Sequence, residues 1–242
     1  MKKILCVLCV LSLGLALTAC GKSPAEPSEA PDNFTWEWES VSGGVNITGY
    51  NGDDTNIVIP SILDNKKVVK LSSDVFSGNV TIKSIVLSEH MTSLNSEAFA
   101  GCDALISITA PGATNIDGRL TDLPALTSLI VPAVRVFSIE SVMHCPSLQK
   151  LDVSGCHLFS KPYYSDIPDS ITEIILPDSL SYHGIDEFYL PHINAVLCTK
   201  EYAEKNNHIN CQPITDALAV YKLIFPKNVT VVVGDEHYFL GE

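Results

Sequence analysis

The stretch "AFAGCDALISITAP", residues 98–111, decides the fold because its pattern recurs along the chain. Its central part, "LISITA" from Leu105, carries apolar or small residues at its first, fourth and sixth positions. This L-x-x-L-x-L form starts five times, at intervals of 23, 21, 22 and 23 residues: at Ile82, Leu105, Leu126, Leu148 and Ile171. Six positions before these starts stand Phe76, Phe99, Leu120, Val142 and, in the last copy, the polar Ser165. The chain is therefore built from repeats of 21–23 residues.

A period of this length predicts a solenoid, in which each repeat forms one coil. We expect one short strand per coil, with its first, fourth and sixth residues pointing inward, while the preceding Phe or Leu closes the far side. A single coil cannot bury its apolar residues alone, so neighbouring coils must stack. Phe99 is therefore expected in a core that two coils share.

Three stretches carry a family resemblance: "ITGYNGDDTNIVIP", "SEAFAGCDALISITAP" and "CTKEYAEKNN". They resemble the BspA-type (Treponema-type) leucine-rich repeat proteins of bacterial surfaces, over roughly residues 41–211. The resemblance implies a right-handed leucine-rich repeat solenoid of the α/β repeat class, mostly β with short helical turns. It also implies extracellular display and protein-binding or adhesive roles, with no catalytic residues to transfer. The pattern erodes at "SVMHC" and "KPYYSDIP", so irregular coils are expected there.

The N-terminus carries an export signal. Lys2 and Lys3 precede an uncharged apolar run, Ile4 to Leu17, that is too short for an ordinary transmembrane helix. The run ends in "LTAC", which resembles the lipobox of bacterial lipoproteins and implies a signal peptide over residues 1–19 and a lipid on Cys20. The alternative is a plain secretory peptide. The Pro-rich residues 21–33 then act as a tether that can span up to about 40 Å, and lipid would anchor the protein to the bacterial membrane, facing outward.

Both ends of the solenoid need a cover. The alternating "FTWEWES" predicts a half-buried strand with Phe34, Trp36 and Trp38 on one face, in an N-terminal β cap over residues 34–70. The competing interpretation makes Trp36 and Trp38 an exposed sugar-stacking platform. The repeats then occupy residues 71–192.

A C-terminal cap is expected over residues 193–242. Within it, "KEYAEKNN" from Lys200 predicts a short helix, and "VYKLIFPKNVTVVVGDEHYFL" predicts two strands around Pro226 and Lys227. Just before the cap, "IDEFYLP" from Ile185 follows the previous start too closely for a full coil, so a shortened turn is expected.

The charge of the chain limits its possible partners, and the positions of its cysteines indicate which thiols are buried and which can pair. Without Lys2 and Lys3 the chain has 13 basic and 28 acidic residues, a net charge of −15 that disfavours nucleic-acid partners. Cys102 and Cys145 stand two coils apart, about 9–10 Å, which is beyond disulfide reach and indicates buried thiols. Cys198 and Cys211 flank the predicted helix and are the candidate disulfide.

No motif of enzyme chemistry is present. The sequence lacks H-E-x-x-H, C-x-x-C, G-x-S-x-G and G-x-x-x-x-G-K-[ST]. His144 and Cys145 are adjacent, but Cys145 shares the frame of the core residue Cys102, so a nucleophile pair is not expected. Asp53 and Asp54 lack the spacing of a calcium loop. We therefore expect a non-catalytic protein without cofactor or metal.

The residues before and after the second apolar position of each strand should point outward and form a ladder. Its first three rows are uncharged on a strongly acidic chain, which favours a contact surface for a protein or a cell-surface polymer. The alternatives are a structural cell-envelope lipoprotein without a soluble partner, a surface enzyme, or a carbohydrate-binding module. The ladder pairs are Ser84 and Val86, Ser107 and Thr109, Ser128 and Ile130, Lys150 and Asp152, and Glu173 and Ile175.

Overall fold

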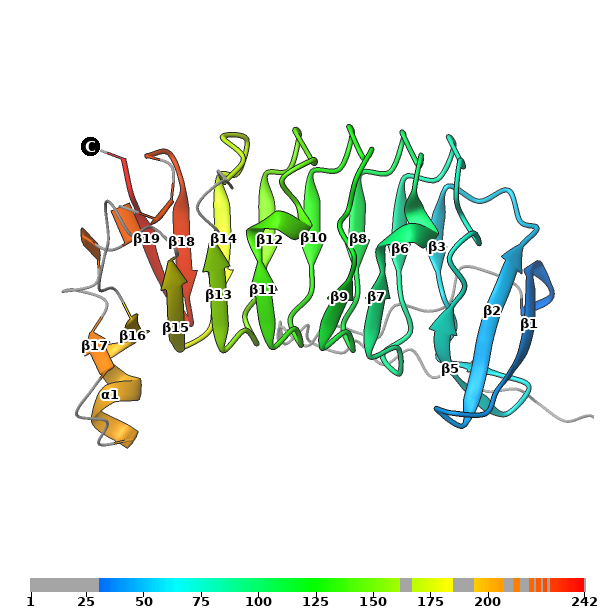
Figure 1. The fold of residues 1–242 in the computed structure, drawn as a ribbon, viewed down its shortest axis with the longest axis horizontal. Coiled ribbons are helices and arrows are strands. Elements are labelled where there is room, and N and C mark those ends of the chain that lie inside the picture. The colour runs from blue at the N-terminus through cyan, green and yellow to red at the C-terminus, as the bar shows by residue number, and fades with distance from the viewer. Residues whose placement is uncertain are drawn as a thin grey trace, which may run out of the picture.

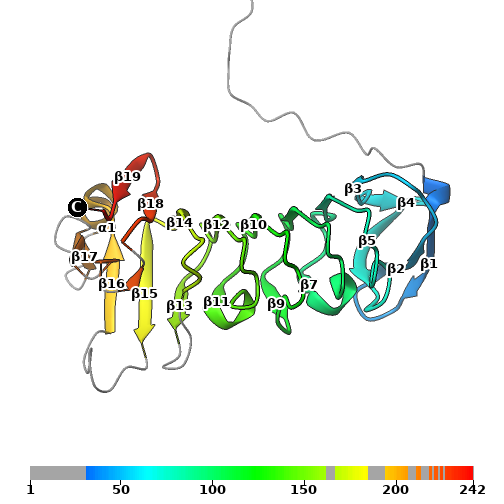
Figure 2. The ribbon, with the colours of Figure 1, turned by 90° about the horizontal axis from the view of Figure 1, so that it is seen from above.

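The computed structural model describes residues 31–161, 167–184, 194–206, 211–213, 218–219, 221–222, 224–225 and 227–241. They form an elongated solenoid with the N-terminal strands at one end and the C-terminal strands at the other (Figure 1). Seen from above, the strands of the coils stand in two rows on opposite sides (Figure 2). The predicted repeat solenoid, mostly β, is confirmed. No helix within the described ranges is long and apolar enough to cross a membrane.

One row is an eight-stranded sheet, here called the front sheet. The predicted strands run parallel and in register, so that Ile85, Ile108 and Leu129 lie side by side and are buried. A further strand, after Asp54, adds at the N-terminal end of this sheet. In spatial order the strands are β3 (Asn56–Val58), β6 (Ser84–Val86), β8 (Ser107–Thr109), β10 (Ser128–Ile130), β12 (Lys150–Asp152), β14 (Glu173–Leu176), β18 (Thr230–Val233) and β19 (Glu236–Phe239).

The other row, the back strands, differs from the prediction of one strand per coil. A second short strand lies in each of several coils, because the L-x-x-L-x-L form returns in the second half of the repeat. Val134, Phe137 and Ile139 hold its three apolar positions in one coil, and all three are buried. These strands are β7 (Ser93–Asn95), β9 (Asn115–Asp117), β11 (Val136–Ser138), β13 (Leu158–Lys161) and β15 (Ser179–Gly184).

Two back strands lead into short 3₁₀ turns, η2 (Ser96–Phe99) and η3 (Ile139–Ser141). The side chains of Asn95 and Ser138 cap them by accepting from the backbone N–H of the second turn residue. Val142 and Cys145 follow η3 and are buried like Phe99 and Cys102, so the coil with the eroded "SVMHC" motif is regular. Most of "KPYYSDIP" lies outside the described residues.

Neighbouring coils approach closely at their corners. At Gly112 a Cβ would lie 2.0 Å from the carbonyl oxygen of Glu89, and at Gly155 it would lie 2.2 Å from that of Pro132. Only glycine fits such a backbone contact, which explains the residue at these two corners.

Aromatic rings link successive coils inside the core. Ring centroids are 5.2 Å apart for Phe34 and Tyr50, 5.6 Å for Tyr50 and Phe76, and 6.1 Å for Phe76 and Phe99. A second column of rings lies near the C-terminal end and joins Phe137, Phe159, Phe225 and Tyr221. Phe99 is fully buried, as predicted.

The N-terminal cap is a four-stranded sheet in the order β1-β2-β5-β4, with the short η1 turn (Pro31–Asn33) before it. Its β4–β5 hairpin turns through Asp64 and Asn65, both with positive φ, as two-residue hairpins favour. Val45, Ile47 and Val68 form its buried face. The strands are β1 (Phe34–Glu39), β2 (Gly44–Tyr50), β4 (Ile62–Leu63) and β5 (Lys66–Leu71).

The prediction that Trp36 and Trp38 cover the end of the solenoid is wrong. Their side chains are 37% and 56% exposed, whereas Phe34 at the start of the same strand is buried. A register shift falls between Thr35 and Trp36, and β1 is the edge of its sheet, so the two indoles have a neighbouring strand on one side only. Phe34 and Tyr50, whose ring centroids lie 5.2 Å apart, supply the aromatic part of the cap instead.

The C-terminal region combines a confirmed helix with a corrected pair of strands. The helix α1 (Lys200–Asn206) lies between β16 (Asn194–Cys198) and β17 (Cys211–Pro213), which pair in parallel. The two last strands, β18 and β19, meet at Gly234 and Asp235 rather than at Pro226 and Lys227.

The predicted strand before Pro226 is also wrong. The N–H of Phe225 donates to the carbonyl of Tyr221, which is a helical turn. The apolar spacing of Tyr221, Ile224 and Phe225 is helical too, and all three are buried. The predicted shortened turn at "IDEFYLP" lies outside the described residues.

Candidate functional site

The predicted ladder exists as a continuous strip on the outer face of the front sheet. Parallel register places Ser84, Ser107 and Ser128 in one column and Val86, Thr109 and Ile130 in the next. Lys150, Asp152, Glu173 and Ile175 continue both columns. All ten side chains are half-buried, while the residues between the columns point into the core. We call these ten residues the front ladder.

Charge divides the front ladder into two parts. Lys150 and Glu173 lie on neighbouring strands and form an ion pair, and the Asp152 carboxylate accepts from the Ser154 N–H. The rows from Ser84 to Ile130 carry no charge, and Asn56 extends them by accepting a hydrogen bond from Ser84 Oγ at 2.7 Å. The uncharged part can bury its side chains against a partner without desolvating an ion.

The spacing of the repeats did not predict a third column of side chains beside the front ladder. It stands directly after the first apolar residue of each repeat, at the entrance to each strand, and Ile106 in it is 43% exposed. Its constant position within every repeat is the sequence signal that identifies this column. Its members are Lys83, Ile106, Thr127, Gln149 and Thr172.

The outer face of the back strands has a different chemistry. Asn115 Nδ2 donates to Ser93 Oγ at 3.1 Å and to Asp117 Oδ1 at 2.6 Å, and Ser93 also bonds to Asp117. These polar groups bond to one another across neighbouring strands and include the charged Asp117, whereas the rows from Ser84 to Ile130 carry no charge.

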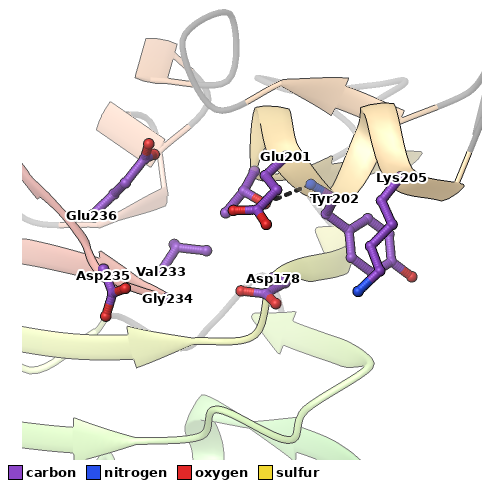
Figure 3. Close-up of a pocket in the computed structure, with 9 residues that line it drawn as sticks. Asp178, Glu201, Tyr202, Lys205, Val233, Gly234, Asp235 and Glu236 are labelled. Carbon is purple, nitrogen blue, oxygen red and sulfur yellow. Dashed lines mark hydrogen bonds between the residues drawn. The ribbon is translucent and has the colours of Figure 1, made fainter.

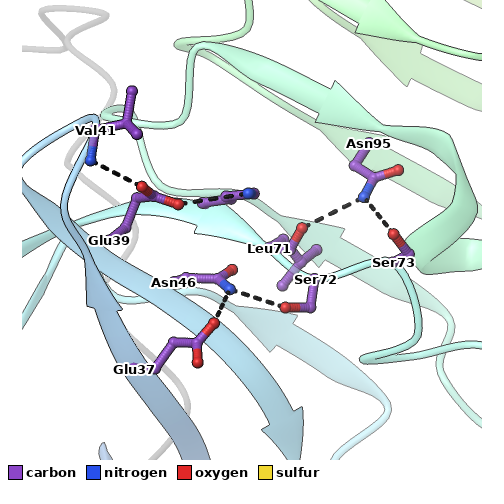
Figure 4. Close-up of polar contacts among 9 residues, drawn as sticks. Glu37, Glu39, Val41, Asn46, Leu71, Ser72, Ser73 and Asn95 are labelled. Carbon is purple, nitrogen blue, oxygen red and sulfur yellow. Dashed lines mark hydrogen bonds and ion pairs between the residues drawn. The ribbon is translucent and has the colours of Figure 1, made fainter.

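A cleft of about 310 Å³ lies where the N-terminal cap meets the back strands. Figure 4 shows polar contacts made by several of its lining residues, among them Glu39 and Asn95. The Val41 N–H donates to the Glu39 carboxylate at 2.9 Å, and this bond, with smaller contributions from Lys70, lowers the pKa of Glu39. On the far wall, Asn95 Nδ2 donates to the Leu71 carbonyl and to Ser73 Oγ. The cleft thus has a mixed polar and apolar lining, and the polar groups named here are paired within the protein.

A second cleft, of about 560 Å³, lies between α1 and the β18–β19 hairpin (Figure 3). Its lining is acidic, with Asp178, Glu201, Asp235 and Glu236 around a single lysine, Lys205. Within the described part of the chain, no group of three His, Cys, Asp or Glu side chains is arranged to hold a metal ion.

The core thiols lie away from solvent and have raised pKa values. Cys102, Cys145 and Cys156 are free and buried. Burial raises the pKa of Cys145 to about 12 and that of Cys156 to about 11, far above the range of reactive thiols. His144 is exposed while Cys145 is fully buried, so the adjacent pair does not meet.

Cys198 is disulfide-bonded. Cys211 begins β17, the strand that pairs with the one containing Cys198, so the backbone brings the two positions onto neighbouring strands. The pairing of Cys198 with Cys211 stays a prediction.

The family model for the BspA type leucine rich repeat region matches residues 69–192 in six copies, one more than the five copies in the sequence pattern. This range is 124 of the 242 residues of the chain. A search of curated proteins finds no match.

Three of the solved structures that match the chain are leucine-rich repeat proteins of bacteria. A leucine rich cell surface protein from Faecalibacterium prausnitzii matches at 20% identity and TM-score 0.45, over 64% of this chain and 50% of that one. The chain thus spans about half the length of that protein. The T. pallidum Leucine Rich Repeat protein matches at 16% identity and TM-score 0.48, over 77% and 98% of the two chains. A leucine-rich repeat protein from Bacteroides ovatus matches at 16% identity and TM-score 0.27, over 67% and 62%.

Proposed function

Because the chain belongs to the family of BspA-type leucine-rich repeat proteins, we propose that it is an exported lipoprotein that binds a protein through its front ladder. One observation carries the proposal: the uncharged, half-buried rows from Ser84 to Ile130 form a regular strip on a chain with a net charge of −13. An uncharged surface on an acidic body is suited to close contact with another macromolecule. A cell-surface polymer is the second partner class.

Non-catalytic binding fits the chemistry of the described residues. The buried thiols have raised pKa values, and repeat solenoids offer extended surfaces for recognition. Side chains that recur in register across several coils suit a partner that makes many weak contacts, whereas an enzyme needs a few groups brought together in one place.

The proposal of a lipid anchor is supported by the lipobox-like "LTAC" and the Pro-rich tether. In a detergent phase-separation assay the mature protein should enter the detergent phase, and Cys20→Ala should move it to the aqueous phase. A wild-type protein that is aqueous after signal removal would overturn lipidation.

The alternative is a structural envelope lipoprotein without a soluble partner. Protease treatment of intact cells separates the two, because a displayed solenoid is cleaved while one behind an outer membrane is protected. Loss of the protein from intact cells, with a cytoplasmic marker preserved, is the expected result; full protection would favour the structural role.

Site-specific crosslinking tests the proposed face. Ser107→benzoylphenylalanine places a photoreactive group in the uncharged rows, and Val136→benzoylphenylalanine places one on the back strands, where Val136 is 58% exposed. Irradiation of living cells in the presence of neighbouring or host cells should give a discrete adduct only for the first variant. Adducts of equal yield from both positions would refute recognition by the front ladder.

A further inference from the structure

Trp36 and Trp38 are the only tryptophans of the chain, and both are exposed at its N-terminal end. They stand two residues apart on β1, opposite Ile47 and Val45 of β2. Cross-strand partners share a face of a sheet, so both indoles lie on one face, about 6.6 Å apart along the strand. Their partners Ile47 and Val45 are fully buried, whereas the indoles at the sheet edge are accessible.

Polar groups stand directly beside this aromatic surface. The ammonium group of Lys66 lies 5.2 Å from the ring centroid of Trp36. The same ammonium group is 2.5 Å from Asp64 Oδ2 and donates to the Asp64 carbonyl at 3.1 Å. An ion pair of this kind is electrically neutral and offers both a donor and acceptors at the rim of the indoles.

We propose that Trp36, Trp38 and the Lys66–Asp64 pair form a binding site for a neutral polysaccharide. A pyranose ring has an apolar C–H face that stacks on an indole and a rim of hydroxyl groups that bind polar side chains. The spacing of the two indoles matches about one sugar residue, so neighbouring residues of one glycan chain can stack on both. The inference does not depend on the front ladder, which lies on other strands.

Other occupants fit the site less well. An anionic bilayer is disfavoured by the net charge of −13, even though one lysine lies at the site. A second copy of the chain needs about 800 Å² per partner for a stable interface, and two partly exposed indoles supply far less, because a whole aromatic side chain buries only about 150–250 Å².

The test uses the full chain carrying Cys20→Ala, so that a lipid does not interfere. Because both tryptophans lie in the site, their emission reports on it alone. The probes are hexasaccharides of β-linked glucose, N-acetylglucosamine, xylose and mannose, each titrated to millimolar concentration. At least one probe should shift or quench the emission in a saturable manner. No saturable response to any of the four probes overturns the proposal, and a response only to anionic phospholipid vesicles does so as well.

Variants locate the binding by native electrophoresis in gels that contain the polysaccharide of the active probe. Trp38→Ala should raise the dissociation constant obtained from the retardation about tenfold, because an aromatic stacking contact contributes about a factor of ten in affinity. Trp38→Phe should retain part of it. The matched control is Phe239→Ala, which removes a 60% exposed aromatic side chain from the other end of the molecule and should not alter retardation. Equal loss in Trp38→Ala and Phe239→Ala would contradict the assignment.

Discussion

Phe99 shows at the scale of one residue how the coils are held together. Its ring stacks on that of Phe76 with an interplanar angle of 8° and is fully buried. Phe99→Ala should lower the free energy of unfolding by about 3–5 kcal/mol, through lost burial and the cavity that remains. Urea denaturation followed by circular dichroism measures this. Phe239→Ala, which truncates an exposed ring, should change it by less than about 1 kcal/mol, and equal effects of the two variants would contradict a shared core.

Two aromatic residues of β1, Phe34 and Trp38, have different roles: Phe34 belongs to the buried cap and Trp38 to the exposed aromatic surface. Phe34 is buried and its ring lies 5.2 Å from that of Tyr50, whereas Trp38 is largely exposed. Phe34→Ala should therefore lower the free energy of unfolding by about 3 kcal/mol, and Trp38→Ala by less than about 1 kcal/mol. Thermal melting of both variants checks the order. A larger loss for Trp38→Ala would instead indicate that the tryptophans form the cap.

At the scale of the element, the sequence pattern predicted the front strands well but missed the back strands. In the front strands the fourth position is always Leu or Ile, so the period is visible. In the back strands the first, fourth and sixth positions are filled by residues as different as Cys156, Phe159 and Lys161, and the period is hidden. A weak form of the local pattern is therefore present, and the stacking of coils adds to it in stabilising these strands.

Cysteines in one frame of the repeat link each coil to the coil before it. The Cys102 thiol donates to the Phe76 carbonyl at 3.0 Å, and the Cys145 thiol donates to the Leu120 carbonyl at 3.5 Å. Desolvation raises the pKa of Cys145 from 9.0 to about 12. Above pH 9 the Cys145 thiol loses its proton in the unfolded state but keeps it in the folded state. The stabilising contribution of this thiol is therefore complete below pH 9 and is lost between pH 9 and about 12.

The raised pKa of Cys145 therefore predicts that the melting temperature depends on pH. The melting temperature of the wild type should fall more steeply between pH 8 and pH 10.5 than that of Cys145→Ala, since the variant lacks the group that titrates. Comparing the two slopes removes the contribution of all other titrating groups. Parallel curves would show that the Cys145 pKa is not raised.

At the scale of the whole molecule, the repeats and the two ends of the solenoid differ in how far the sequence predicts their surfaces. The front ladder could be predicted from the sequence because alternation along a strand fixes which side chains point outward. The two clefts could not be predicted, and the sequence left open whether Trp36 and Trp38 are buried or exposed. Both features depend on how the hairpins of the cap and the helix α1 dock at the ends of the solenoid. End regions lack the repeat, so their packing leaves no period in the sequence.

The central claim is that the uncharged rows of the front ladder bind a partner. Val86→Glu with Ile130→Glu adds two carboxylates to this strip, where both residues are half-buried. The matched control is Val80→Glu with Val136→Glu, since these side chains are 62% and 58% exposed and lie outside the front ladder. All three proteins should have the same melting temperature within a few degrees.

The decisive measurement is quantitative capture of proteins from extracts of host or neighbouring cells on immobilised wild type and on both double variants. Burial of an unpaired carboxylate in an interface costs well over 1.4 kcal/mol, so the front-ladder variant should lose about tenfold or more of the captured partner. The control variant should capture the partner as the wild type does. Identical capture by all three proteins would contradict recognition through the front ladder, and no capture by any of them would favour a purely structural lipoprotein.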